Sequence, residues 1–109
     1  MVGSLRKGRE FQSVYGQKNS RANRMLVMYV AANGFEKNRI GIVTSKKIGN
    51  SVVRHRVRRL IRESLRQNGD RFNIGLDIIV IARETCVGRT QAEITEAVLH
   101  VAGLHGITV

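Results

Sequence analysis

The residues best suited to chemistry in this sequence are cations, and they gather in one stretch from Lys46 to Arg66. The stretch holds eight basic side chains against one acid, Glu63, and so carries +7 of the formal net charge of +11. Arginine outnumbers lysine there, and a guanidinium group can hold a phosphate through two parallel hydrogen bonds. The predicted chemistry is the binding of a polyanion, in the first place a nucleic acid. The basic residues are Lys46, Lys47, Arg54, Arg56, Arg58, Arg59, Arg62 and Arg66.

The spacing of this stretch predicts an amphipathic helix from about Ser51 to Arg66, with Asn50 as N-cap and its end near Asn68-Gly69. Its arginines fall on the side away from the apolar residues, and like charges at i, i+4 destabilise a helix by roughly 0.2–0.5 kcal/mol per pair. A bound polyanion would remove that repulsion, so we interpret this side as a binding face and not as a merely solvated one. The apolar face consists of Val53, Val57, Leu60, Ile61 and Leu65, with Ser64 among them.

No residues suited to catalysis by the protein itself accompany these cations. The eight carboxylates are scattered singly, and no Ser/His/Asp set or two-metal spacing is recognisable. The three histidines, His55, His100 and His105, have no partner at metal-ligand spacing, so no metal site is predicted. His55 lies inside the basic stretch, where we interpret it as a helix-surface residue and not as a proton-transfer group.

Length and composition predict a single globular domain over residues 1–109. The chain is 42% hydrophobic and has no proline, no repeat and no low-complexity segment. Its one cysteine, Cys86, cannot form an internal disulfide, and we expect it to be a small structural residue. No apolar run approaches the roughly 18 residues of a membrane span, and no signal-peptide core is visible. We therefore expect a cytoplasmic protein.

The segments before the basic stretch predict one short helix and a pair of strands. Residues 9–15 place Phe11, Val14 and Tyr15 on one side of a helix that Gly16 would end in the left-handed conformation. Residues 25–32 and 39–45 read as strands joined by a turn at residues 33–34, and we expect them to be antiparallel neighbours. The polar residues 18–24 would form at most a short edge strand.

The segments after the basic stretch predict a buried strand and a final helix. Residues 77–83 are apolar on both faces, as expected of a central strand. Thr90 and Glu93 have the spacing of a capping box. The residues that continue the helical period after it are Ile94, Ala97, Val98, Val101 and Leu104.

Read in this setting, the sequence resembles the protein subunit of bacterial ribonuclease P. The family's signature has the form Lys-Lys-x-Gly-x-Ala-Val-x-Arg-Asn-Arg-x-Lys-Arg-x-x-Arg, with which residues 46–62 align in register. The departures are Ser51 for Ala, His55 for Asn and Arg58 for Lys. Residues 11–15, 22–29 and 77–83 resemble the family's first helix, leading strands and last strand, so the resemblance covers residues 4–104.

The resemblance implies an α+β fold, a two-layer α/β sandwich in which helices pack on a mixed four-stranded sheet, with a left-handed β-α-β crossover around the arginine helix. It also implies a role in the enzyme that removes the 5′ leader from precursor tRNA. In that enzyme the RNA subunit holds the active site and its Mg²⁺, and the protein binds that RNA and the leader. No membrane or further protein partner is implied.

The resemblance also assigns roles to residues. The positions implied to bind the RNA subunit are Lys46, Lys47, Arg54, His55, Arg56, Arg58, Arg59 and Arg62. Those implied to bind the leader are Phe11, Tyr15, Val27, Tyr29 and Lys46. His55 can donate, accept or stack on a base, so we expect its RNA contact to persist in altered form.

Three other kinds of protein would also be small and basic. A ribosomal protein that binds rRNA is the main alternative, although it would not explain the aromatic residues gathered near one sheet face. A helix-turn-helix regulator would need a helix at turn distance before the arginine helix. A self-sufficient metal nuclease would need a cluster of metal ligands.

Overall fold

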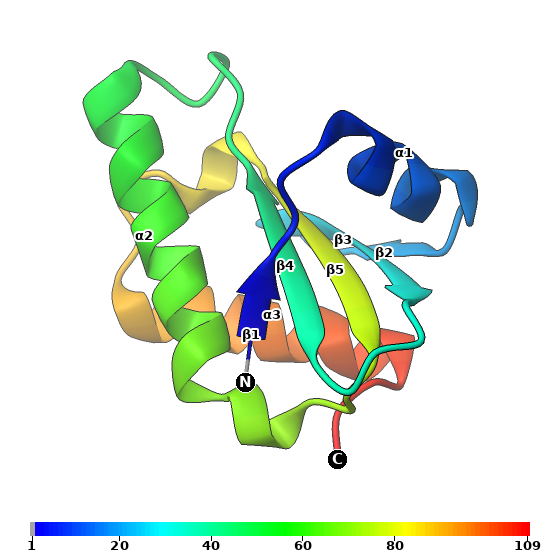
Figure 1. Cartoon of the computed structure of the whole chain (residues 1–109). Helices are drawn as coiled ribbons and strands as arrows, with labels where there is room; N and C mark the ends of the chain where they lie inside the picture. The colour runs from blue at the N-terminus through cyan, green and yellow to red at the C-terminus, as the bar shows by residue number, and fades with distance from the viewer. Residues whose placement is uncertain (1) are drawn as a thin grey trace.

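The order of the strands is set by the one strand that is apolar on both faces. The computed structural model describes residues 2–109, and its mixed sheet has the order β1-β4-β5-β3-β2 (Figure 1). β5 lies at the centre, parallel to β4 and antiparallel to β3. The five strands are β1 (Val2–Ser4), β2 (Ser20–Ala22), β3 (Leu26–Ala32), β4 (Asn38–Val43) and β5 (Leu76–Ala82).

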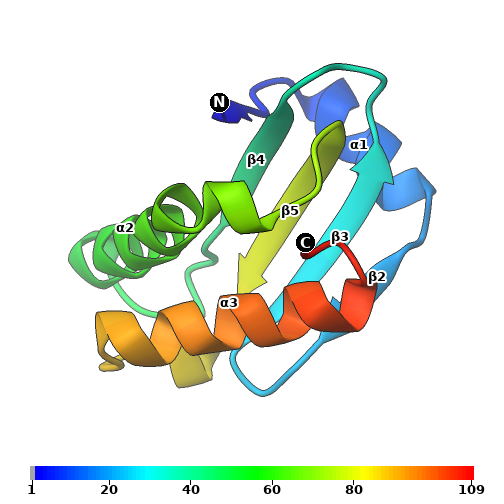
Figure 2. The same ribbon diagram turned by 90° about the horizontal axis from the view of Figure 1, so that it is seen from below.

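Three helices cover the two faces of the sheet unequally. α1 (Gly8–Gly16) lies on one face alone, while α2 (Ser51–Gln67) and α3 (Gln91–His105) lie on the other (Figure 2). Short 3₁₀ turns at Gly69–Arg71 and Glu84–Cys86 flank β5. The predicted α+β class is confirmed, and α1 leaves much of its own face uncovered.

The position of β5 corrects one prediction. β3 and β4 run in opposite directions, but they are not neighbours, because β5 pairs with both of them. Ile78, Ile79 and Val80 are fully buried, and a strand that is apolar on both faces needs neighbours on both edges and cover on both sides. The turn after β3 therefore spans the width of one strand.

The sheet has five strands, where the resemblance implied four. β2 is the short edge strand expected within residues 18–24. β1 was not predicted, because three residues carry no usable alternation, and it adds to β4 in parallel. Both edges of the sheet thus end in strands of three residues, and short edges of this kind offer little template for pairing with another chain.

The crossover from β4 through α2 to β5 is left-handed. Seen from the α1 side in Figure 1, β4 and β5 both run upward and β5 lies to the right of β4. The connection passes by the opposite face, where α2 packs with α3 (Figure 2). Nearly all such connections are right-handed, so this rare hand confirms what the resemblance implied.

The helix boundaries follow their predicted caps, except at α1. The Asn50 side chain accepts a hydrogen bond from the Val53 amide at 3.0 Å, and Thr90 and Glu93 form the predicted capping box. Gly16 is the last residue of α1 and does not adopt the left-handed conformation; Lys18 does, with φ 55°. Lys18 is exposed and lies in the turn that connects α1 to the edge strand β2.

The main core lies between the sheet and the helices α2 and α3. From α2 it takes Val57, Ile61, Ser64 and Leu65, which confirms the predicted apolar face. Cys86 is fully buried at its rim, and its thiol donates to the Met25 carbonyl oxygen. Burial raises the pKa of that thiol, which keeps it protonated.

α1 is tied to the opposite face by a bridge through Arg39. The Arg39 guanidinium donates to both Asp77 carboxylate oxygens, at 2.8 and 2.6 Å, and to a Glu10 oxygen at 2.8 Å. The second Glu10 oxygen accepts the backbone amides of Arg6 and Lys7. These amides, together with the Arg39 charge, hold the pKa of Glu10 below its usual value. One side chain of β4 therefore joins β5 to the start of α1.

We predict that Arg39→Met lowers the free energy of unfolding by about 3 kcal/mol, because it leaves the buried Asp77 carboxylate without a cation. Urea unfolding at neutral pH measures this loss. Arg66→Met is the matched control, since Arg66 also pairs with a carboxylate but is 68% exposed. It should cost less than about 1 kcal/mol. Equal losses of unfolding free energy in the two variants would show that the Arg39 bridge stabilises the fold no more than an exposed ion pair does.

Candidate nucleic-acid interface

The arginines of α2 are almost free of acidic partners. In the part of the chain that the structure describes, Arg66 alone among them pairs with a carboxylate, at 2.5 Å from Glu63. That contact lowers the pKa of Glu63 and raises the pKa of Arg66. The cations without a carboxylate within reach are Arg54, Arg56, Arg58, Arg59 and Arg62.

These cations occupy two flanks of the helix and not one face. Arg58 Nη2 donates to Thr44 Oγ1 at the end of β4, at 3.0 Å. Arg56 Nη2 donates instead to the Arg89 carbonyl just before α3, at 3.1 Å. Arg59 and Arg62 are exposed, and no hydrogen bond to another described residue restrains their guanidinium groups. The predicted phosphate-binding residues thus differ in how tightly the protein holds them.

Arg54 and Arg58 are half-buried, and each has one polar atom packed against the rest of the protein. Their Nε atoms are shielded from solvent and have no hydrogen-bond partner within the described structure. Long basic side chains can bury their stems while the charged end stays accessible. These two guanidinium groups are thus positioned by packing before any ligand arrives.

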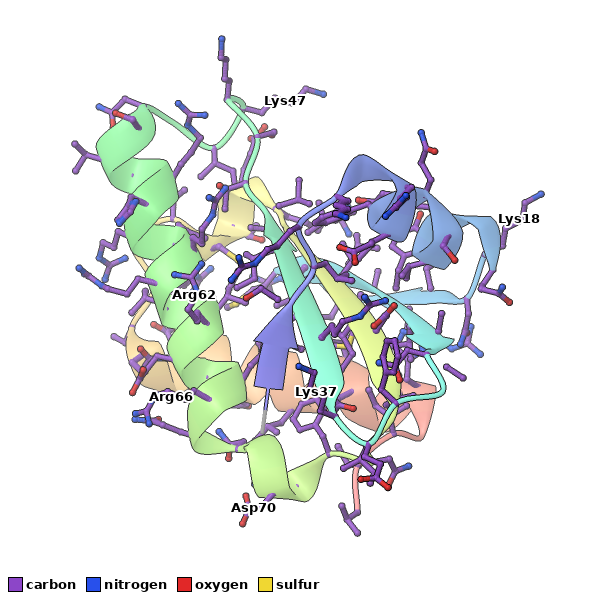
Figure 3. The ribbon with its side chains drawn as sticks, in the orientation of Figure 1. Lys18, Lys37, Lys47, Arg62, Arg66 and Asp70 are labelled. Atoms are coloured by element: carbon purple, nitrogen blue, oxygen red, sulfur yellow. The ribbon has the colours of Figure 1, made fainter. Side chains whose placement is uncertain are left out.

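The predicted lysines and His55 surround the start of α2. Lys46 and Lys47 are exposed in the loop between β4 and α2, and Lys47 lies near the bend of that loop, at the top of Figure 3. Arg62 and Arg66 follow along the helix in the same view. His55 is exposed in the first turns of α2. The structure therefore extends the basic surface from the loop along the whole helix.

The aromatic residues gather on the α1 face of the sheet, as predicted. Val27 and Tyr29 of β3 point toward this face, and the rings of Tyr15 and Tyr29 meet edge to face with centroids 4.8 Å apart. Burial, and then the nearby Tyr29, raise the pKa of Tyr15, which keeps it a neutral phenol. Neither hydroxyl has a protein partner within the described chain, and neither is sealed from solvent. Each ring therefore presents a polar edge to water.

Phe11 lies on the same face, but the free side of its ring faces a different cavity. A Cβ atom on Gly41 would lie 2.6 Å from the Phe11 ring, so only glycine allows α1 to approach β4 this closely. The free side of Phe11 lines a cavity that also includes Arg58 and Arg62. Four of the five predicted leader-binding residues thus share one sheet face, although Phe11 borders a separate cavity. The fifth, Lys46, lies in the loop between β4 and α2.

Two further cations near the site were missed by the sequence reasoning. Arg24 and Arg83 line a cavity of about 750 Å³ together with Lys47, at the end of the sheet next to Val27. Arg24 precedes β3 and Arg83 follows β5, so pairing of the two strands brings them together across 59 positions of sequence. No local spacing signals this, and only the correct strand order would have revealed it.

The described residues include no group of three or more His, Cys, Asp or Glu side chains placed to hold a metal ion. Four of the eight carboxylates are instead engaged by the protein, since Glu10, Glu63, Asp77 and Glu93 each pair with an arginine. Within residues 2–109, no helix has both the length and the apolar character that a bilayer crossing requires.

Comparison of the sequence with known proteins gives one consistent result. A family model described as Ribonuclease P matches residues 3–103. The ribonuclease P protein component of Lachnoclostridium phytofermentans is 50% identical over 107 residues, which cover 98% of this chain and 92% of that protein. The corresponding protein of Alkaliphilus oremlandii is 46% identical over 99 residues, covering 91% and 87%.

Solved structures agree with this result. The RNase P protein of Staphylococcus aureus superposes with a TM-score of 0.88 at 34% identity and covers 97% of each chain. The RNase P protein of Thermotoga maritima superposes with a TM-score of 0.84 at 28% identity, covering 91% of this chain and 94% of its own.

The unpaired cations predict that anions stabilise the folded protein. An anion that binds only the folded state at about ten times its Kd adds roughly 1.4 kcal/mol to the free energy of unfolding. We expect sulfate or pyrophosphate to raise Tm above that in sodium chloride of equal ionic strength. The rise should be smaller in Arg54→Ala/Arg58→Ala. A midpoint that depends on ionic strength alone would contradict specific anion binding.

Proposed function

The chain belongs to the ribonuclease P protein family, and we propose that it holds the RNA subunit through the cations of α2 and the 5′ leader of precursor tRNA on the sheet face beside α1. Ribonuclease P is a ribonucleoprotein endonuclease of tRNA processing. The single observation that carries the proposal is the group of five α2 arginines that have no acidic partner among residues 2–109. The family match argues against the ribosomal alternative.

The two flanks of α2 support contact with a folded RNA and not with an isolated strand. The rise along an α-helix is 1.5 Å per residue, so the stretch from Arg54 to Arg62 spans about 12 Å. Arg56, next to α3, and Arg62, next to β1 and β4, point in different directions around it. We propose that Lys46, Lys47 and His55 extend the contact at the N-terminal end of the helix.

The tyrosine pair supports the leader site. Stacking on an aromatic ring contributes about 1 to 3 kcal/mol per base and reads no sequence, as an enzyme that accepts many precursors requires. Tyr15, Val27 and Tyr29 offer such a surface in the part of the face that α1 leaves open, and Phe11 borders it. Lys46, in the loop between β4 and α2, would hold the backbone further along the leader.

The cavity at the end of the sheet supports a direction for the leader. From Tyr29 the surface continues past Val27 to Arg24, Arg83 and Lys47. We propose that leader phosphates beyond the tyrosine pair pass these three cations. The leader would then run along β3, from the aromatic pair to the loop that precedes α2.

Mg²⁺ belongs, in this proposal, mainly to the RNA subunit. The side chains of residues 2–109 do not fit a resident metal, since no cluster of ligands is formed. We assign no catalytic group to the protein, and we propose that residues 1–109 act as one RNA-binding domain. A cytoplasmic location is supported by the RNA partners and by the single buried cysteine.

The RNA-subunit contact predicts a change in salt dependence. Each phosphate neutralised contributes roughly 0.7 to 0.9 to the slope of log K against log salt. Arg59→Ala/Arg62→Ala removes two cations whose guanidinium groups bond to no other residue in the described structure, and should flatten the slope by about 1.4 to 1.8. Titration of the RNA subunit with protein at several salt concentrations measures it.

Lys18→Ala/Arg21→Ala is the control for that measurement. It removes the same charge from the region of β2, at the edge of the sheet opposite β1 and α2 (Figure 3). The slope should stay close to that of the unmodified protein. If both pairs flatten the slope equally, the contact is not localised to α2.

The leader site predicts a loss that depends on the substrate. Tyr29→Ala or Tyr15→Ala should weaken holoenzyme binding of a precursor with a leader of several nucleotides by about fivefold or more, the loss of one stacked base. Affinity for mature tRNA should be nearly unchanged. Tyr29→Phe and Tyr15→Phe keep the ring and should bind almost normally. Equal losses on precursor and mature tRNA would show that the rings serve folding or the RNA subunit.

A further inference from the structure

A cavity of about 370 Å³ lies between β1, β4 and α2. Some of its lining residues belong to the proposed RNA contacts, but the interior of the cavity has no role in the function proposed so far. Its apolar wall is formed by Ile40 and Ile42 of β4 and Leu65 of α2, and one side is closed by the ring of Phe11. Arg58 and Arg62 line it from α2. The hollow thus combines an apolar interior with a cationic rim.

The edge of β4 is open at this cavity. β1 ends at Ser4, which pairs with Ile40, and the chain then turns away toward α1. The Leu5 amide donates to the Ile40 carbonyl, so backbone groups of Ile40 point toward β1. Backbone direction alternates along a strand, so the amide and carbonyl of Ile42 point the same way, toward an edge with no strand beside it. One donor and one acceptor are therefore presented side by side.

The charge at the rim is not neutralised. Neither Arg58 nor Arg62 has a carboxylate within reach among the described residues. Arg58 is held in place by its bond to Thr44, and its Nε is shielded from solvent without a partner. A guanidinium group can bind a phosphate along its edge or stack on a base with its plane. The rim suits an anion that carries a flat group.

We propose that this cavity receives one unstacked nucleotide of the bound RNA, with its base against Ile40, Ile42 and Leu65 and its phosphate between Arg58 and Arg62. The inference rests on the proposed RNA contact of α2 and adds a pocket for a single base to it. The Ile42 amide and carbonyl would pair with a base edge that has an acceptor next to a donor.

The dimensions favour one nucleotide over longer RNA. Small-molecule sites have volumes of roughly 300–1,000 Å³, and this cavity lies at the low end of that range. Proteins read RNA mostly at loops and bulges, where bases can leave the stack. Such a base can come from the RNA subunit or from the precursor, and the chemistry of the site is the same for both.

Filling the cavity without removing a cation tests the proposal. Ser4→Tyr places a ring at its β1 side, while Ser13→Tyr adds the same ring to the exposed surface of α1. We expect Ser4→Tyr to weaken RNA binding about tenfold, the loss of one inserted base, with an unchanged salt slope. Ser13→Tyr should bind normally. Unchanged affinity of Ser4→Tyr for both RNAs would overturn the pocket.

Separate titrations of the RNA subunit and of precursor tRNA identify the source of the base, because only the RNA that supplies it should lose affinity for Ser4→Tyr. This result is independent of the general contact along α2. If Arg59→Ala/Arg62→Ala flattens the salt slope while Ser4→Tyr leaves the affinity for both RNAs unchanged, the proposed base pocket is wrong and the proposed function stands.

Methyl NMR of the unmodified protein gives a second test that does not depend on a variant folding. Adenosine monophosphate should shift the methyl signals of Ile40, Ile42 and Leu65, and ribose 5-phosphate at the same concentration should shift them much less. Equal shifts with the two probes, or none with either, would show that no base enters and would overturn the proposal.

Discussion

The bridge from Arg39 to Asp77 and Glu10 is the interaction on which the arrangement of this domain depends. It joins β4, β5 and α1 through one guanidinium group with four charged oxygens around it, three of them in direct hydrogen bonds. Two residues further along β4, Gly41 lets the Phe11 ring lie against the backbone. Together they hold α1 close to one end of the sheet face, which leaves the tyrosine pair beside open space. On its other face, β4 contributes Ile40 and Ile42 to the hollow beside α2.

α2 serves two purposes that oppose each other energetically. Its apolar side completes the main core, and its remaining surface concentrates cations that repel one another, of which only Arg66 pairs with an acid in the described part of the chain. A carboxylate opposite each arginine would stabilise the free protein, but it would also repel phosphate. If RNA binds α2 as we propose, its binding is coupled to folding, because an anion on α2 removes a repulsion that the folded chain cannot relieve by itself.

Local patterns predicted the elements well, and long-range pairing was the part that they could not supply. The helical period of Val57, Ile61 and Leu65, the Asn50 cap and the Thr90 capping box each act within a few residues, so their outcome is visible in the sequence. The insertion of β5 between β3 and β4 depends on contacts across more than 30 residues. The three-residue β1 carries no periodic signal. The left-handed crossover came only from the family resemblance.

The same distinction between local patterns and long-range pairing applies to the candidate site. The α2 cations are a local feature and were predicted from their spacing, whereas Tyr15 and Tyr29 were assigned to one site only by the family resemblance; the roles of both groups remain predictions. Arg24 and Arg83 lie close together only because β3 and β5 pair, and the open edge at Ile42 exists only because β1 stops at Ser4.

The proposed function is tested most directly by reconstitution with a bacterial ribonuclease P RNA at low magnesium, using a precursor tRNA with a leader of several nucleotides. We expect the protein to raise the cleavage rate, and to raise it less for a precursor whose leader is a single nucleotide. No increase with either precursor would contradict the proposed function.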